Sequence, residues 1–81
     1  MHVDTRGLQP AHVGKRLRLD REAGKFDEIK LLELNVCEEG GACCGITYRL
    51  LSASPAGELR VDGGVYWMPF QDIRNFQVLG D

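Results

Sequence analysis

The chain of 81 residues is long enough for one small domain, and a domain of this size buries only about 60% of its unfolded surface. Its mixed charge and its share of aliphatic and aromatic residues are those of a globular protein, which excludes a wholly disordered chain. The net charge of −2 excludes a large basic field of the kind that attracts nucleic acid.

The first residues contain Gly7 and Pro10 and show no hydrophobic periodicity. We therefore expect a flexible N-terminal arm over residues 1–12 and a single β domain over residues 13–81. There is no basic start followed by an apolar run, and no apolar stretch approaches membrane length, so neither a signal peptide nor a membrane span is expected. An odd number of cysteines without a secretion signal favours a reducing, cytoplasmic location.

The stretch VGKRLRL alternates between apolar and basic residues. Val13, Leu17 and Leu19 share one parity, and Arg16 and Arg18 share the other. This pattern predicts a half-buried strand that ends at the charged, glycine-containing turn DREAGK.

The next stretch, FDEIKLLELNVC, fits two structures. Its good helix formers allow a helix at about 21–34, which would make the protein an α+β domain. Against this, Ile29 and Leu31 alternate with polar residues, and Leu34 alternates on the opposite parity. A β-bulge near Leu31–Leu32 would place both sets on one face. We favour the strand, because the following apolar segment resembles its hairpin partner.

That partner, CGITYRLLS, has Ile46, Tyr48 and Leu50 on one parity. A three-residue turn over residues 39–41, with Gly41 in the left-handed conformation, sets apolar residues opposite each other. The expected pairs are Val36 with Cys44, Leu34 with Ile46, and Leu32 with Tyr48.

In this register the cysteines separate. Cys44 becomes a small hydrophobic residue of the core, whereas Cys37 and Cys43 form a cross-strand pair on the other face. Two unreactive thiols, a reversible disulfide and a metal site remain open for this pair. The spacing Cys-x₅-Cys-Cys is not that of a structural zinc site, so no metal or other cofactor is expected.

The segments ELRV and VYWM flank DGG, which is a hairpin signal. A turn over residues 62–64 puts Trp67 in the core and puts Arg60, Tyr66 and Met68 on the outer face. A turn at Gly63–Gly64 alone would turn Trp67 outward beside Arg60, and we prefer the first register because it matches the first hairpin.

The proline in PFQD suits a short 3-10 turn, and IRNFQVL closes the chain as a last strand. The sequence therefore predicts a mainly β fold: a five-stranded antiparallel meander or small barrel with a 3-10 turn before the last strand. The layout of Val65–Leu79, VYWMPFQDIRNFQVL, resembles that of SH3-like small barrels, in which such a turn separates the fourth and fifth strands. Residues 13–25 lack the aromatic motif of peptide-binding SH3 domains, so binding of proline-rich peptides is not implied. An OB-like barrel fits the pattern almost as well.

Motifs of catalysis are missing: there is no phosphate-binding loop, no nucleophile elbow and no His-Glu-x-x-His. We expect no enzyme but an interaction module that forms a dimer or tetramer, or binds a protein partner, through sheet edges and an aromatic patch. The residues expected in this patch are Arg60, Tyr66, Trp67, Met68 and Phe70.

Two alternatives stay open. A nucleic-acid-binding barrel would contact phosphates through a basic cluster and stack bases on Tyr66 or Trp67. The cluster consists of Lys15, Arg16, Arg18 and Arg21, with Arg60 as a further contact. A small-molecule or metal site between subunits would instead be lined by Cys37, Cys43, Tyr66 and Trp67.

Overall fold

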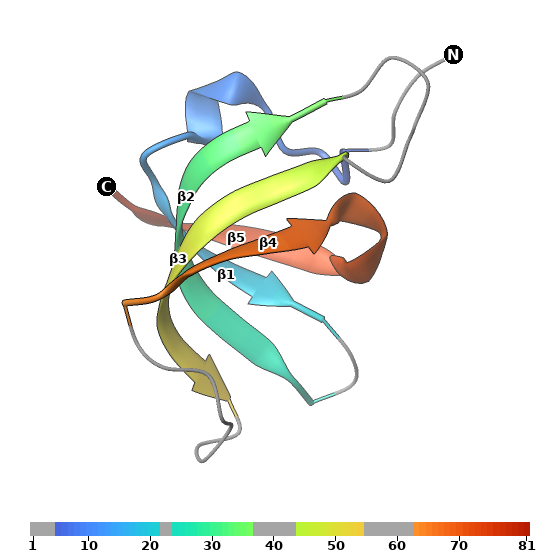
Figure 1. The fold of residues 1–81 in the computed structure, drawn as a ribbon. Coiled ribbons are helices and arrows are strands. Elements are labelled where there is room, and N and C mark those ends of the chain that lie inside the picture. The colour runs from blue at the N-terminus through green and yellow to red at the C-terminus, as the bar shows by residue number, and fades with distance from the viewer. Residues whose placement is uncertain (1–4, 22–23, 37–43, 55–62) are drawn as a thin grey trace.

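The computed structural model of the protein describes residues 5–21, 24–36, 44–54 and 63–81. Five antiparallel strands form one curved sheet in the order β4-β3-β2-β1-β5 (Figure 1). The strands are β1 Arg16–Asp20, β2 Phe26–Asn35, β3 Gly45–Ser54, β4 Val65–Pro69 and β5 Asn75–Gly80. Two 3-10 turns flank them, η1 Pro10–His12 and η2 Phe70–Asp72.

The predicted fold class is confirmed, because the protein is mainly β and η2 lies directly before the last strand. The sheet is not closed into a barrel: β4 and β5 are its two edges and do not pair with each other. The alternative with a helix at about 21–34 is wrong, since Phe26–Asn35 forms a strand that pairs with both β1 and β3.

Strand β1 shows the predicted alternation. Leu17 and Leu19 are fully buried, while Arg16 and Arg18 are exposed. The strand begins at Arg16 and not at Val13, which directly follows η1 and donates its backbone N–H to Pro10 as the C-cap. Val13 therefore stays outside the core, with 41% of its surface exposed.

Strand β2 contains the predicted β-bulge. Leu31 faces Tyr48 and Glu33 faces Thr47, so Leu32 has no opposite residue on β3. The extra residue reverses the parity, which brings Leu31 and Leu34 to the same face. The expected pair of Leu32 with Tyr48 is wrong, because the bulge leaves Leu32 unpaired and Tyr48 lies opposite Leu31.

The end of the β2–β3 ladder has the predicted register, with Leu34 opposite Ile46. Cys44 is buried against the core, as expected. Val36 lies beyond the last pair of the ladder and is 55% exposed. The turn at 39–41 and the cysteines Cys37 and Cys43 fall outside the described residues.

The predicted side of Trp67 is wrong. Strand β4 pairs with β3, so Met68 faces Ile46 and Tyr66 faces Tyr48 on the inner face of the sheet. Trp67 lies opposite Thr47 on the outer face and is 45% exposed. The apolar inner face of β3 fixes this register. The expected partner strand, residues 58–61, lies outside the described residues.

The core fills the concave inner face of the sheet. Its buried members include Leu17, Leu19, Ile29, Leu31, Ile46, Tyr48, Leu50, Met68, Phe70 and Ile73. The N-terminal segment also contributes: Leu8 is 3% exposed, and the ring of His12 meets the ring of Phe76 edge-on. The part of the predicted N-terminal arm that follows Asp4 thus packs onto the sheet.

Candidate binding surface

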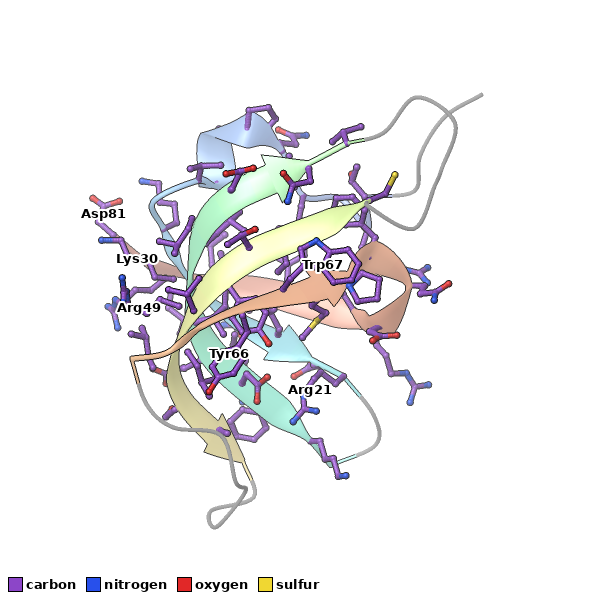
Figure 2. All side chains as sticks on the ribbon, in the orientation of Figure 1. Arg21, Lys30, Arg49, Tyr66, Trp67 and Asp81 are labelled. Atoms are coloured by element: carbon purple, nitrogen blue, oxygen red, sulfur yellow. The ribbon has the colours of Figure 1, made fainter. Side chains whose placement is uncertain are left out.

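The residues of the predicted aromatic patch do not share a surface. Met68 and Phe70 are each 4% exposed and belong to the core, and Tyr66 is half-buried against it. Trp67 alone among the described members of the patch is exposed, and Figure 2 shows it projecting from β4 toward the viewer. Arg60 lies outside the described residues.

The outer, convex face of the sheet carries a row of basic residues that crosses three strands. Arg16 on β1 lies opposite Lys30 on β2, and Lys30 lies opposite Arg49 on β3. All three residues are exposed. Like charges placed directly opposite on neighbouring strands destabilise a sheet, so this cation row is an electrostatic cost to the fold.

A carboxylate lies beside the Arg16 end of the cation row. Lys15 forms an ion pair with Asp81, and Arg16 Nε donates a hydrogen bond to the Asp81 main-chain oxygen at 3.2 Å. The hydrogen bond and the charge of Lys15 hold the pKa of Asp81 below its ordinary value, and the charge of Lys30 adds to this effect. Figure 2 shows Lys30, Arg49 and Asp81 on the same side of the molecule. The electrostatic environment at this end of the row therefore favours an anion.

Strand β3 supplies the far end of the row. Arg49 Nη1 donates a hydrogen bond to the main-chain oxygen of Gly63 at 2.6 Å, which fixes the side chain beside the start of β4. Its neighbour across the ladder is the exposed Val65. Trp67 follows two residues later on the same face, so the row ends beside an exposed aromatic ring.

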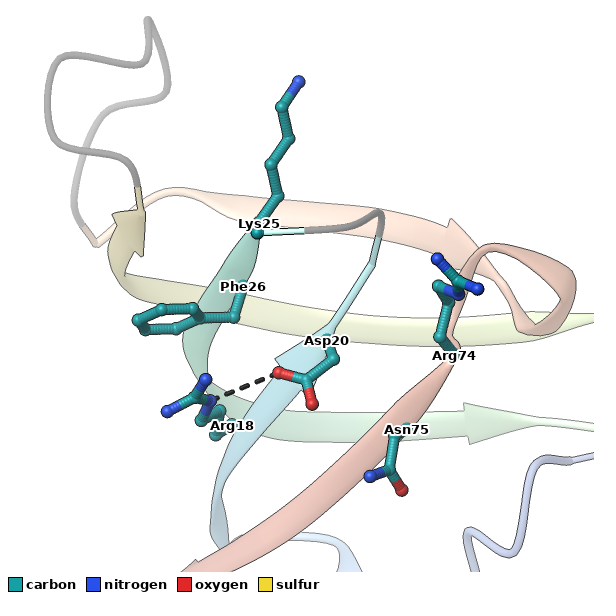
Figure 3. A pocket seen from close by; sticks show the side chains of 7 residues that line it. Arg18, Asp20, Lys25, Phe26, Arg74 and Asn75 are labelled. Atoms are coloured by element: carbon teal, nitrogen blue, oxygen red, sulfur yellow. Dashed lines mark hydrogen bonds and ion pairs between the residues drawn. The ribbon is translucent and has the colours of Figure 1, made fainter.

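A second basic region lies at the other end of the outer face. The guanidinium of Arg18 sits 3.7 Å from the centre of the Phe26 ring, and its Nε donates to Asp20 Oδ1 at 3.2 Å. With Lys25 and Arg74 these groups line a cleft of about 340 Å³ (Figure 3). The cation–π contact and the hydrogen bond hold Arg18 in place, so its charge has a fixed position on this face.

Arg21, the fourth member of the predicted basic cluster, turns away from the outer face. Its Nε lies 3.1 Å from Asp27 Oδ2, and its Nη2 donates to Asp27 Oδ1 at 3.3 Å. Asp27 is completely buried on the inner face of β2, opposite Leu19 and Ala53. In this structure Arg21 is therefore not part of the cation row, because it neutralises a buried carboxylate.

Lys30 and Arg49 were missed from the sequence. They are 19 positions apart in the chain, and only the β2–β3 register makes them neighbours. The sequence did contain one signal for their exposure. Lys30 and Arg49 each directly follow a core residue, Ile29 and Tyr48, so alternation along the strand places both on the outer face. Basic residues that are close together in the sequence, such as Lys15, Arg16 and Arg18, are easily recognised. The members of the cation row lie on three different strands, so their proximity is not visible in the sequence.

The sheet edges differ in how they are protected. Strand β4 has five residues and ends in Pro69, which cannot donate a backbone hydrogen bond. Strand β5 has six residues with neither a charge nor a proline, and it exposes Val78 (44%) and Leu79 (36%). Natural proteins usually block an edge with charge, proline or short length, so β5 is the less protected of the two.

The described part of the chain holds no group of three or more His, Cys, Asp or Glu side chains placed to bind a metal ion. Within the same residues, no helix has the length and apolar character needed to cross a membrane. Comparisons of the sequence and the structure with protein-family models, with curated proteins and with solved structures find no match.

Proposed function

We propose that this protein is a non-enzymatic interaction module that self-associates through the edge of β5. The observation that carries the proposal is the uncharged stretch Asn75–Gly80, which forms an unprotected edge with two exposed aliphatic residues. A chain this small gains stability from a partner chain, because a second copy buries surface that a single domain of this size leaves exposed. The strand order and the turn η2 before β5 also support the resemblance to SH3-like small barrels.

A second copy of the chain fits this edge better than an unrelated strand, because β5 is bounded by opposite charges. Arg74 precedes it and Asp81 follows it. In an antiparallel pair of β5 strands centred on Gln77, Phe76 meets Val78 of the other copy on the inner face. Arg74 then lies opposite Gly80 of the other copy, one residue from Asp81, so the charges that bound β5 attract each other at both ends of the interface.

Native mass spectrometry under reducing conditions tests this proposal by comparing the wild-type protein with Val78→Lys. We expect the wild-type chain to be a dimer and Val78→Lys to be a monomer, because a charge on an edge strand opposes pairing with another strand. Val65→Lys is the matched control: it places the same charge at a similarly exposed valine on the opposite edge, and should remain dimeric.

Circular dichroism of both variants checks that each is folded. A wild-type monomer at micromolar concentration would disprove self-association. A dimer that survives Val78→Lys but is lost in Val65→Lys would assign the interface to β4 and contradict the proposed edge.

A further inference from the structure

We propose that the convex outer face of the sheet binds single-stranded nucleic acid, with phosphates on the cation row Arg16–Lys30–Arg49 and a base stacked on Trp67. This is a second activity, because the row crosses β1, β2 and β3 on the outer face, whereas the proposed dimer interface is the β5 edge. The two surfaces meet where Arg16 lies opposite Gly80.

Charge distribution is the first support. The described residues contain nine Lys/Arg and six Asp/Glu, while the rest of the chain contains one Lys/Arg and six Asp/Glu. The described residues thus carry a net charge of +3 within a chain of net charge −2. The five strands themselves hold four Lys/Arg and four Asp/Glu, so positive charge on the sheet is concentrated locally in the cation row. Neighbouring strands lie roughly 4.8 Å apart, so the cation row spans on the order of 10 Å across the sheet. Nothing in the fold requires three basic residues to oppose one another, whereas a bound polyanion would offset their repulsion.

The carboxylate of Asp81 is the second support. It forms an ion pair with Lys15, and Arg16 Nε donates a hydrogen bond to the main-chain oxygen of the same residue at 3.2 Å. The hydrogen bond and charge of Lys15, with a smaller effect of Lys30, lower the pKa of Asp81, in keeping with a site for a negative group. The Asp81 side chain is 87% exposed, so it can leave without opening the core. A phosphate group could take its place and make the same charge-assisted contacts.

The exposed ring of Trp67 makes a nucleic acid a better fit than other polyanions. Trp67 lies opposite Thr47, which is two residues from Arg49 on the same face, roughly 7 Å along the strand. Base stacking on an exposed aromatic ring next to a basic track is the usual way in which proteins bind single strands. Bases in a duplex are already stacked on each other, so the ring selects for unpaired nucleotides.

Two carboxylates set the direction of the bound strand. Glu28 and Glu33 lie on β2 on either side of Lys30. A nucleic-acid backbone that ran along β2 would meet these negative charges, whereas a backbone that crosses the strands from Arg16 to Arg49 avoids them. The expected track therefore follows the cation row and ends at β4, where Trp67 is exposed.

Trp67 is the only tryptophan in the chain, so its fluorescence reports on this surface directly. We expect a short oligothymidylate to quench the fluorescence of the wild-type protein at low salt. Contacts with three phosphates predict a slope of about −2 for the logarithm of affinity against the logarithm of salt concentration, a loss of roughly 20-fold between 50 and 200 mM.

Lys30→Gln should weaken binding, reduce this slope by about 0.7 and leave the thermal midpoint unchanged or higher. The matched control is Lys25→Gln, which removes the same charge five residues away, just before β2 begins, and should bind like the wild-type protein. Trp67→Leu, followed by the anisotropy of a labelled oligonucleotide, should lose affinity without a change in slope.

The absence of quenching at low salt would overturn the proposal, as would equal losses of affinity in Lys30→Gln and Lys25→Gln.

Heparin and vesicles containing phosphatidylserine are the competing ligands. If either binds as tightly as the oligonucleotide and with the same dependence on Lys30, the face recognises anions in general and the assignment to nucleic acid is wrong. Loss of binding in Val78→Lys would show that this surface depends on the dimer, which contradicts the independence proposed here.

Discussion

At the scale of single residues, the fully buried carboxylate of Asp27 pairs with Arg21. A fully buried carboxylate on the inner face of a sheet is costly unless a charged partner compensates it. Replacing Asp27 with Ala would leave the guanidinium of Arg21, whose side chain is only 15% exposed, without its carboxylate. We expect a loss of about 3–5 kcal/mol in the free energy of unfolding, measured by urea denaturation.

The double variant Arg21→Met/Asp27→Leu removes both charges and fills the space with apolar atoms. It should regain most of the lost stability, because well-packed apolar residues often replace a buried ion pair at no net cost. If the double variant is as unstable as Asp27→Ala alone, the pair has a role beyond charge compensation and this explanation fails.

Asp81 gives a prediction about pH. Its pKa in the folded protein lies below the ordinary value because of Lys15, so the interaction stabilises the fold above the unfolded pKa of about 4. That contribution disappears as the pH falls through the lower, folded pKa. An NMR titration of the Asp81 side chain should show the lowered pKa in the wild-type protein and a pKa closer to the ordinary value in Lys15→Gln. An unchanged titration in Lys15→Gln would contradict the contact.

At the scale of elements, the close approach of β3 and β4 depends on Gly45. A Cβ atom at this position would come within 2.9 Å of the Met68 carbonyl carbon and of Pro69 Cα, and this backbone cannot move without opening the ladder. Gly45→Ala should therefore lower the free energy of unfolding by about 1–3 kcal/mol and loosen the end of β4. Thermal unfolding and limited proteolysis measure the two effects, and a variant as stable and as resistant as the wild type would contradict this packing.

The strands could be predicted from the sequence wherever alternation was strong. The buried leucines of β1, the bulge at Leu32 and the register of Leu34 with Ile46 all follow from keeping apolar residues on one face. The side of Trp67 could not be predicted in this way, because the prediction used the DGG turn signal, whereas the pairing of β4 with β3 determines which face Trp67 takes. The buried Asp27 shares the parity of Ile29 and Leu31, and alternation alone does not reveal that Arg21 would compensate it.

At the scale of the whole molecule, the net charge of −2 gave no indication of the cation row. The strands contain as many Asp/Glu as Lys/Arg, so only the positions of the basic residues, and not their number, create the row. The cation row also depends on three strands that are distant in sequence, and only the complete register assembles it. The same openness of the sheet provides both proposed surfaces, one on its convex face and one at its β5 edge.

The two unlike edges of the sheet also bear on polymer growth. Pairing of β5 with β5 consumes one edge of each copy and leaves a closed pair whose two outer borders are both β4. Growth beyond two copies would then require β4 to accept another chain. Pro69 and the short length of β4 make that border a poor template for another strand, so in the proposed dimer Pro69 would oppose growth of the sheet into a fibre.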